Sequence, residues 1–274
     1  MVVPLGENGG LLEWVPHLEG LRKILNKLYK SIGKYTRVSE LKRSELNVRD
    51  PLEKKRDIFL KKWLPLHPPV FPEWFRQTFP DPPGWYIARQ SYTRTTAVIS
   101  MVGYILGLGD RHGENVLVDS ESGDTVHVDF NCLFNQGERF DWKERVPFRL
   151  THNMVAAMGP LGVEGTFRKS CEISLRVLRS QKKTLMSVLT PFAYDPFGSW
   201  GKNKEIVQNE RDKKINEAFN ELSDIEKRLN GSLRVNQVNS NLYLSVEGQV
   251  RSLILEATNI DNLCQMWFGW APYL

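Results

Sequence analysis

The sequence has few cysteines and no long hydrophobic run. Its 274 residues include three cysteines, Cys132, Cys171 and Cys264, which are odd in number and too far apart for a disulfide framework or a metal-ligand pattern. This usage is typical of a reducing compartment. The longest apolar stretch, 97–108, is interrupted by a serine and two glycines and falls well short of the ~20 residues that a membrane helix needs. We therefore expect no membrane span, and residues 1–10 lack the features of a signal peptide.

The chain also lacks a strong excess of charge of either sign, although its positive and negative residues are unevenly distributed along the sequence. Hydrophobic residues make up 41% of the chain and charged residues 25%, which is ordinary for a globular protein with a buried core. The net charge is 37 − 32 = +5, and residues 17–62 hold 14 Lys/Arg against 6 Asp/Glu. Such a basic stretch can attract nucleic acid or acidic lipid. We favour the solvated faces of two helices, and expect no sequence-specific nucleic-acid binding.

Hydrophobic periodicity predicts the elements of the first half of the chain. Residues 11–15 indicate a strand or extended connector that Pro16 ends, and 17–31 an amphipathic helix that Gly33 ends. A second, basic helix is expected over 52–64. Residues 65–83 contain 7 of the 15 prolines and several aromatics, so we expect a packed but irregular connector. Residues 91–108 are apolar on nearly every side, which predicts a buried helix.

The second half is expected to hold a hairpin and more helices. Residues 116–118 and 126–130 flank a turn-rich sequence and predict a β-hairpin. A helix is expected over 167–187, and a last one from Ser245 through Ala257. The inward side chains expected on the helix over 167–187 are Ile173, Leu175, Val177 and Leu178. Between these two helices lies a polar stretch, expected to be helical and capped by Gly231, whose apolar positions are Ile206, Ile215, Phe219, Leu222, Ile225 and Leu229.

The densest chemical signal is the sequence 107–119, followed by 126–131. Asp110 precedes Asn115 by five residues, and Asp129 follows Asn115 by fourteen. Phosphoryl transfer uses one carboxylate to orient the attacking hydroxyl and accept its proton, and a second carboxylate and a neutral amide to hold divalent metal on the nucleotide phosphates. Protein kinases use this Asp-to-Asn spacing, with a metal-binding Asp after a short hairpin. The order Asp-Arg-His departs from the usual His-Arg-Asp.

Each of these residues also has a structural interpretation. Asp110 and Asn115 are common turn residues, and Asp129 could be a surface strand residue. Their combination at these spacings favours the catalytic interpretation. His112 could stabilise charge on the terminal phosphate in the transition state, or it could be a structural histidine. We favour function for His112 as well.

These motifs resemble the phosphatidylinositol-3-kinase-related protein kinases. The sequence Gly-Asp-Arg-His-x-x-Asn at 109–115 and His-Val-Asp-Phe at 127–130 carry the resemblance. Residues 12–15, 100–106, 127–134 and 146–154 are similar to the ATR-type, DNA-damage checkpoint members, and Asn131 agrees with that type. Residues 244–274 resemble the C-terminal FATC segment of the family.

The resemblance implies an α+β, mostly α fold: a protein-kinase-like C-terminal lobe with a small β-hairpin at the active site and no N-terminal lobe. The expected parts are the end of the N-lobe and hinge (1–16), the C-lobe (17–197), a polar helical linker (198–243) and the FATC segment (244–274). Within the C-lobe the catalytic loop is expected at 107–119 and the activation segment at 129–151. The implied reaction transfers the ATP γ-phosphate, with Mg²⁺ or Mn²⁺, to serine or threonine of protein substrates. The resemblance also implies a nuclear location and regulation by partner proteins.

The resemblance also assigns roles to individual residues. Asp110 would be the catalytic base, His112 the phosphate partner, and Asn115 and Asp129 the metal ligands. The adenine would lie between the hinge residues Glu13, Trp14 and Val15 and an apolar floor formed by Leu117 and Val128. The last part of the activation segment would line the pocket for the residue that follows the target serine or threonine, and the family prefers glutamine at that position. The residues of this part are Val146, Pro147, Phe148, Arg149, Leu150 and Thr151.

One departure from a complete kinase is large. A glycine loop, a phosphate-binding lysine and its acidic partner should precede the hinge, yet only ten residues precede Leu11. We therefore expect the chain to be a C-terminal fragment that binds ATP poorly and transfers phosphate slowly by itself.

Two other functions stay open. A phosphoinositide lipid kinase shares the Asp-Arg-His-x-x-Asn loop but needs a basic cluster in its activation segment, whereas here acidic residues such as Glu138 and Glu144 alternate with basic ones such as Arg139 and Arg145. A catalytically dead interaction module would use the basic stretch 17–62 and the aromatic tail as binding surfaces. For the tail we favour packing onto the lobe, where it would brace the activation segment.

Overall fold

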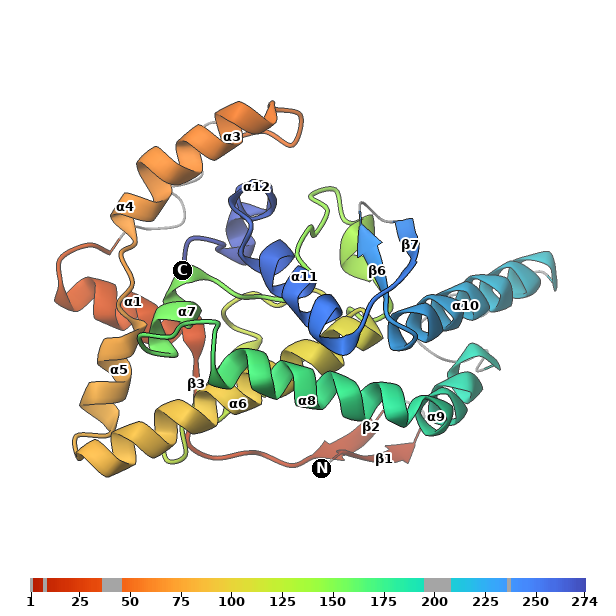
Figure 1. Ribbon diagram of the computed structural model, residues 1–274, viewed down its shortest axis with the longest axis horizontal. Helices are drawn as coiled ribbons and strands as arrows, with labels where there is room; N and C mark the ends of the chain where they lie inside the picture. The colour runs from red at the N-terminus through yellow and green to blue at the C-terminus, as the bar shows by residue number, and fades with distance from the viewer. Residues whose placement is uncertain (1, 7–8, 36–45, 195–207, 236–237) are drawn as a thin grey trace.

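The computed structural model describes residues 2–6, 9–35, 46–194, 208–235 and 238–274. Helices dominate it, with strands confined to small antiparallel sheets (Figure 1). Strands β1 (Val2–Gly6) and β2 (Gly9–Leu12) form an exposed hairpin at the N-terminus. In the described residues, no helix is long and apolar enough to cross a membrane.

The helix expected over 17–31 begins later than the periodicity indicated. Residues 18–20 form strand β3 (Leu18–Gly20), and helix α1 covers Leu21–Ser31. Strand β3 pairs with β4 (Val116–Asp119), which pairs with β5 (Thr125–His127). The predicted hairpin is therefore confirmed, but it carries a third strand from nearly a hundred residues earlier. Gly33 ends α1 in the left-handed region at φ +69°, as expected.

The region expected to be an irregular connector contains a helix. The chain runs through α3 (Leu52–Ile58), a π-helical turn (Phe59–Trp63) and α4 (Leu64–Leu66) before α5 (Phe71–Thr78). Proline is accepted in the first turn of α5 because the missing N–H has no intrahelical partner there. Phe71, Trp74 and Phe75 are buried, which confirms the expected packing of this region. The prediction that the region is irregular is wrong, because it contains α5.

Among the described helices, α6 (Pro82–Leu106) is the longest, and it begins nine residues before the helix expected at 91. Asp81 caps it by accepting the N–H of Gly84 at 2.7 Å. It ends at Gly107, whose φ of +64° and close approach to Asn135 leave no room for a side chain. The expected catalytic loop (107–119) begins at this turn.

Helix α8 (Thr166–Ser180) lies along α6 (Figure 1). The single helix expected over 167–187 breaks at Gln181, and α9 (Lys182–Tyr194) follows. The expected inward face is also wrong in part, because Ile173 and Val177 are 58% and 55% exposed. Leu175 is buried as expected, and the buried face also carries Phe167 and Cys171, whose Sγ lies near the carbonyl of Ala97 in α6.

The stretch expected to be a helical linker contains helix α10 (Gln208–Leu229) and an unexpected hairpin, β6 (Ser232–Val235) and β7 (Val238–Tyr243). Leu222, Ile225 and Leu229 are buried as expected, whereas Phe219 is 37% exposed. Gly231 follows the helix at φ +101°, which confirms its predicted role. Ile206 and the side chain of Ile215 lie outside the described part.

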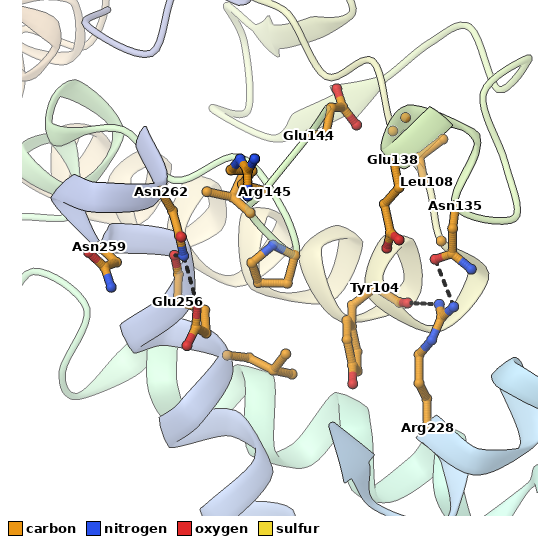
Figure 2. Close-up of a pocket in the computed structure, with 16 residues that line it drawn as sticks. Tyr104, Leu108, Asn135, Glu138, Glu144, Arg145, Arg228, Glu256, Asn259 and Asn262 are labelled. Atoms are coloured by element: carbon orange, nitrogen blue, oxygen red, sulfur yellow. Dashed lines mark hydrogen bonds between the residues drawn. The ribbon is translucent and has the colours of Figure 1, made fainter. Parts of the chain in front are cut away.

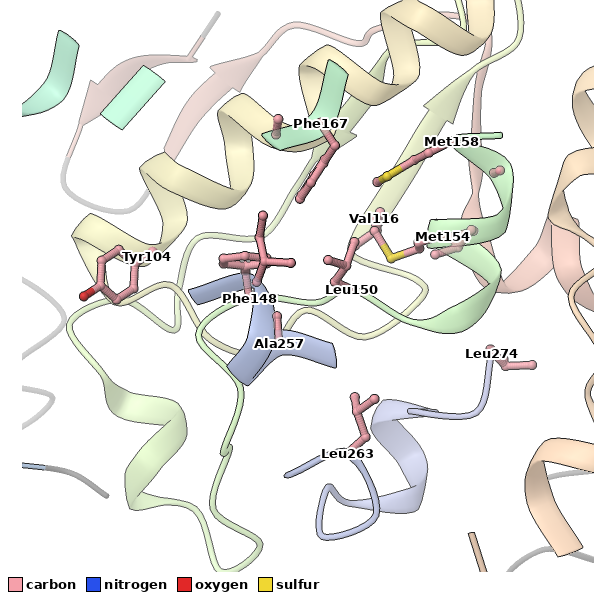
Figure 3. Packing of buried hydrophobic residues seen from close by; sticks show 14 of the residues in the cluster. Tyr104, Val116, Phe148, Leu150, Met154, Met158, Phe167, Ala257, Leu263 and Leu274 are labelled. Carbon is pink, nitrogen blue, oxygen red and sulfur yellow. The ribbon is translucent and has the colours of Figure 1, made fainter. Parts of the chain in front are cut away.

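The C-terminal segment closes the core. Ser245 caps α11 (Val246–Thr258), and α12 (Ile260–Leu263) and a 3₁₀ turn (Phe268–Trp270) follow. The predicted packing of the tail is confirmed for Trp270, Tyr273 and Leu274, which are at most 4% exposed, whereas Trp267 is 44% exposed. The remaining elements are a 3₁₀ turn (Gln136–Arg139) and α7 (His152–Ala157), which follows the buried Phe148 and Leu150 (Figure 3). The mostly helical α+β class is thus confirmed.

Candidate active site

The kinase-like motif at 109–115 lies between the end of α6 and the start of β4. Gly109 donates its N–H to the carbonyl of Cys132 at 2.7 Å. Asp110 adopts a left-handed backbone at φ +55°, an unusual conformation for a residue with a side chain. The Nδ2 of Asn115 donates to the carbonyl of Asp110 at 2.9 Å. The loop therefore closes on itself and presents the Asp110 side chain, which is 40% exposed.

Asn115 and Asp129 come together across the hairpin. Val128 donates its N–H to the carbonyl of Asn115 at 3.1 Å, so the residue after it lies near the start of β4. Asp129 is also left-handed, at φ +59°, which ends the expected strand 126–130 at His127. Its Oδ1 accepts the N–H of Asn131 at 3.2 Å.

The donor set of this pair suits a hard cation that is bound together with phosphate. The amide nitrogen of Asn115 is engaged by Asp110, so Asn115 offers its Oδ1, and Asp129 offers an exposed carboxylate. Among the described residues, no group of three or more His, Cys, Asp or Glu side chains could hold a metal ion. Mg²⁺ is usually held by one or two carboxylates with substrate phosphates and water, and the pair fits that mode.

His112 faces Asp110 as a neutral ring. Glu114 donates its N–H to Nδ1 of His112 at 3.2 Å, so the proton of the neutral imidazole lies on Nε2, which is 3.9 Å from Oδ2 of Asp110. Burial is the largest cause that lowers the pKa of His112. The ring can therefore donate a hydrogen bond at neutral pH without carrying charge.

Arg111 is a functional candidate to which the motifs assign no role. It is 3% exposed. Its guanidinium donates to the carbonyls of Gly109 at 2.8 Å, of Val128 at 2.7 Å and of Asp129. One side chain thus fixes the catalytic loop against the start of the expected activation segment. The sequence feature that could have indicated a role for Arg111 is its position between Asp110 and His112.

The residues expected to bind the nucleotide lie in the connector after β2 and in or next to the β3–β4–β5 sheet. Glu13, Trp14 and Val15 follow β2 and are exposed, Trp14 by 85%. Five residues further on, Gly20 pairs with Leu117 in the sheet. Val116 and Val118 point into the core, so the alternation of the strand turns Leu117 to the opposite face. Val128, 37% exposed, continues from β5 beside it. Leu117 lies in the β3–β4–β5 sheet and Val128 directly follows β5, whereas Glu13, Trp14 and Val15 lie outside this sheet, so no strand pairing brings the expected hinge and floor together.

The expected substrate-pocket residues divide into two groups. Val146 and Pro147 line a cavity of about 330 Å³ together with Glu144, Arg145 and residues of α11 and α12 (Figure 2). Phe148, Leu150 and Thr151 are buried in the core beside α7 (Figure 3). These three buried side chains anchor the segment in the core. Of the six expected pocket residues, Val146 and Pro147 are the ones that line the cavity.

Arg149 links the segment to the C-terminal tail. It is 3% exposed and donates to the carbonyls of Trp270 at 2.5 Å and Ala271 at 2.9 Å. Its guanidinium also lies 4.3 Å from the ring centroid of Trp270. Burial lowers the pKa of Arg149 to about 9. Arg22 adds a second link, from α1 to the carbonyl of Gly269.

His127 lies at the centre of this arrangement as a neutral side chain. In the described part of the chain its two ring nitrogens are buried without a hydrogen-bond partner. Burial, followed by the charges of Arg111 and Arg149, lowers its pKa to about 3. A neutral imidazole between two buried guanidinium groups avoids adding a third positive charge.

Comparisons with protein families agree with the motifs. A family model described as phosphatidylinositol 3- and 4-kinase matches residues 1–202. A second, the FATC domain, matches residues 243–274.

Similar proteins extend over the whole chain. The serine/threonine-protein kinase ATR of Drosophila melanogaster is 50% identical over 273 residues, which are 100% of this chain and 10% of that protein. Protein kinase rad3 of Schizosaccharomyces pombe is 48% identical over 274 residues, 100% of this chain and 11% of that protein. The chain thus spans about a tenth of the length of these curated relatives.

Solved structures show the same fold. The structure titled "FAT and kinase domain of CtTel1" matches with a TM-score of 0.83 and 33% identity, over 100% of this chain and 18% of that one. The "Tel1 kinase butterfly symmetric dimer" matches with a TM-score of 0.81 and 34% identity, over 100% of this chain and 11% of that one. The expected kinase fold is confirmed.

Proposed function

The chain belongs to the phosphatidylinositol 3- and 4-kinase family, and from this premise we propose that it is part of a DNA-damage checkpoint kinase that phosphorylates serine or threonine in proteins. The observation that carries the proposal is the arrangement of Asp110, Asn115 and Asp129. Hydrogen bonds from Asn115 to Asp110 and from Val128 to Asn115 hold these three residues in one small region. The relatives at 48–50% identity are named as protein kinases.

The roles follow from the chemistry of each side chain. The exposed carboxylate of Asp110 orients the substrate hydroxyl and accepts its proton as the oxygen attacks the γ-phosphorus and the bond to ADP breaks. His112 donates from Nε2 to a phosphate oxygen on which charge develops. Asn115 and Asp129 would hold a divalent cation, Mg²⁺ or Mn²⁺, which when bound neutralises phosphate charge. Arg111 maintains the spacing between these groups through its three carbonyl contacts.

The nucleotide and peptide sites complete the proposal. Glu13, Trp14 and Val15 would receive adenine above Leu117 and Val128. The surface of Val146 and Pro147 beside the cavity would receive the residue after the target, glutamine by preference. The division into hinge (1–16), C-lobe (17–197), linker (198–243) and FATC segment (244–274) follows the same assignment. We propose a nuclear location and regulation by partner proteins that bind the longer protein.

The acceptor decides between protein and lipid kinase. The longer protein that contains this chain is incubated with Mg-ATP and either a Ser-Gln peptide, the matching Ser-Ala peptide or phosphatidylinositol vesicles. We expect transfer to the Ser-Gln peptide, slower transfer to the Ser-Ala peptide and none to the vesicles. Transfer to the vesicles alone would establish the lipid kinase instead, and no transfer to any acceptor would favour the interaction module. The 274-residue chain by itself is expected to transfer phosphate poorly.

A further inference from the structure

Glu144 reaches from the activation segment back to the catalytic loop. Its Oε1 accepts the backbone N–H of Asp110 at 2.9 Å. Its own N–H donates to the carbonyl of Gly137 at 3.0 Å. In the sequence Glu144 is one of several charges that alternate in sign, whereas in the fold its carboxylate accepts a hydrogen bond from the backbone of the expected catalytic loop. One side chain therefore connects two segments that are 34 residues apart.

Two glycines make room for this carboxylate. A Cβ on Gly109 would lie 2.5 Å from Oε2 of Glu144, and a Cβ on Gly137 would lie 2.0 Å from it. Neither glycine is in the left-handed region, so backbone conformation does not explain them. Both positions lack a side chain where Glu144 requires space, which indicates that the fit between the loop and this carboxylate is specific.

The contact acts on a backbone that needs support. Asp110 is left-handed at φ +55°, a conformation that carries strain for a residue with a Cβ and persists where the surroundings fix it. The peptide before Asp110 is held at its N–H by Glu144, and the peptide after it is held at its carbonyl by Asn115. Together these two bonds set the direction in which the Asp110 side chain leaves the loop.

Burial of Glu144 at this place is costly. Desolvation is the main cause that raises its pKa, to about 7, and the nearby charges of Asp110 and Glu138 act in the same direction. The Asp110 N–H and Arg111 oppose the shift. A carboxylate placed at such a cost beside a second carboxylate is typical of a group kept for function.

We propose that Glu144 is a positioning residue that holds Asp110 in its reactive orientation and so couples the placement of the activation segment to catalysis. This inference rests on the proposed function, because it assigns Asp110 as the base. Glu144 also lines the 330 Å³ cavity beside Val146 and Pro147 (Figure 2). Displacement of the segment from this cavity withdraws the acceptor from the Asp110 amide.

The test compares three variants in the longer protein that contains this chain. Glu144→Gln keeps an acceptor oxygen at the same distance, whereas Glu144→Ala and Glu144→Leu remove it. We expect Ala and Leu to lower kcat on a Ser-Gln peptide by about 10- to 100-fold, since small misplacements at a reacting centre have effects of this size. We expect KM for ATP to change less than threefold, and Glu144→Gln to retain at least a third of kcat.

Glu172 provides the matched control. It is a buried glutamate on α8 that pairs with Lys169 at 2.7 Å, away from the catalytic loop. Glu172→Ala should lower stability without changing kcat per folded molecule. An unchanged kcat in the Glu144→Leu variant, or an equal loss in the Gln and Leu variants, would overturn the proposal. The Glu144→Leu variant is included because leucine fills the space of the glutamate side chain, so the test can still be made if the Glu144→Ala variant does not fold.

Hydrogen exchange gives a readout that does not depend on activity. The amide of Asp110 should exchange faster in Glu144→Leu than in the wild type, and Glu144→Gln and Glu172→Ala should leave it protected. Unchanged protection in Glu144→Leu would contradict the proposed support of the loop. If the wild-type protein transfers no phosphate, the proposed function fails, while the exchange measurement still decides whether Glu144 holds Asp110.

Discussion

His112 combines a neutral ring with a fixed tautomer, and both properties follow from neighbours in the loop. Glu114 donates to Nδ1, and burial lowers the pKa of the ring. Under the proposed function, a neutral donor beside Asp110 can stabilise charge that develops on a phosphate oxygen.

Replacement of His112 therefore tests transition-state stabilisation. We expect His112→Ala to lower kcat by about 10²-fold, the usual effect of removing one preorganised donor, with little change in KM for ATP. Single-turnover phosphorylation of a Ser-Gln peptide by the longer protein measures it. A large rise in KM with unchanged kcat would show instead that His112 binds the nucleotide in its ground state.

Glu144 also predicts a pH dependence of stability. The folded pKa is raised to about 7 from an ordinary value of 4.5. Below that ordinary value the carboxyl is protonated in both states. As the pH rises through 4.5–7 the unfolded chain loses the proton first, so stability is lost over this window.

The variant Glu144→Gln removes this titration. Its unfolding free energy relative to the wild type should therefore rise by roughly 2 kcal/mol between pH 5.5 and pH 8. Urea unfolding of the 274-residue chain at the two pH values checks this. A pH-independent difference would show that Glu144 does not titrate in the folded chain with a raised pKa.

At the residue scale, the spacing of side chains along the sequence was enough to predict the candidate site residues that lie close together in the chain. Asp110, Asn115 and Asp129 form a local pattern whose chemistry is known. Arg111, Glu144 and Arg149 act on backbone atoms that are far along the chain or on another element, and no periodicity marks such contacts. Their contributions depend on the tertiary fold, so only the structure could reveal them.

At the scale of elements, the C-terminal tail and the activation segment depend on each other. Arg149 carries two hydrogen bonds to the tail and lies against Trp270. Tyr273 packs in turn on His67 and Trp63, with ring centroids 4.5 and 5.4 Å apart. The tail therefore braces the segment through the side of the lobe formed by the α3–α4 region.

Removal of the Arg149 guanidinium should weaken this bracket. Arg149→Leu leaves the carbonyls of Trp270 and Ala271 buried without their donor, at a cost of about 2–4 kcal/mol in unfolding free energy. Denaturant unfolding followed by tryptophan fluorescence measures it. Arg251→Leu, on the exposed side of α11, should change stability by less than about 0.5 kcal/mol. Equal effects of the two substitutions would refute the bracket.

Elements with long periodic patterns were predictable, and short or non-local ones were not. Helices α1, α6 and α11 follow their apolar spacing. Strand β3 has three residues and exists because it pairs with β4, a partner that local sequence does not reveal. The hairpin β6–β7 lies in a polar stretch with little hydrophobic alternation. Pro72 in the first turn of α5, and Pro82 and Pro83 in the first turn of α6, occupy positions where a helix accepts proline.

At the scale of the whole molecule, the chain is a kinase-family lobe whose core includes its own C-terminus. Buried residues from α1 to Leu274 form one connected core, which agrees with the paired matches to the kinase and FATC family models. The excess of positive charge over 17–62 is accounted for in part by helices on the surface of this lobe, where exposed pairs such as Lys61 with Asp57 are found.

The most direct test of the account is phosphate transfer by the longer protein with Asp110→Asn. Asn keeps the shape of the side chain but cannot accept the hydroxyl proton, so we predict a fall in kcat on a Ser-Gln peptide of about 10²- to 10⁴-fold with ATP affinity retained. Asp57→Asn, on the surface of α3, should transfer at the wild-type rate. Wild-type transfer by Asp110→Asn would contradict the account, because the loop would then have no base at the position on which every other assignment depends.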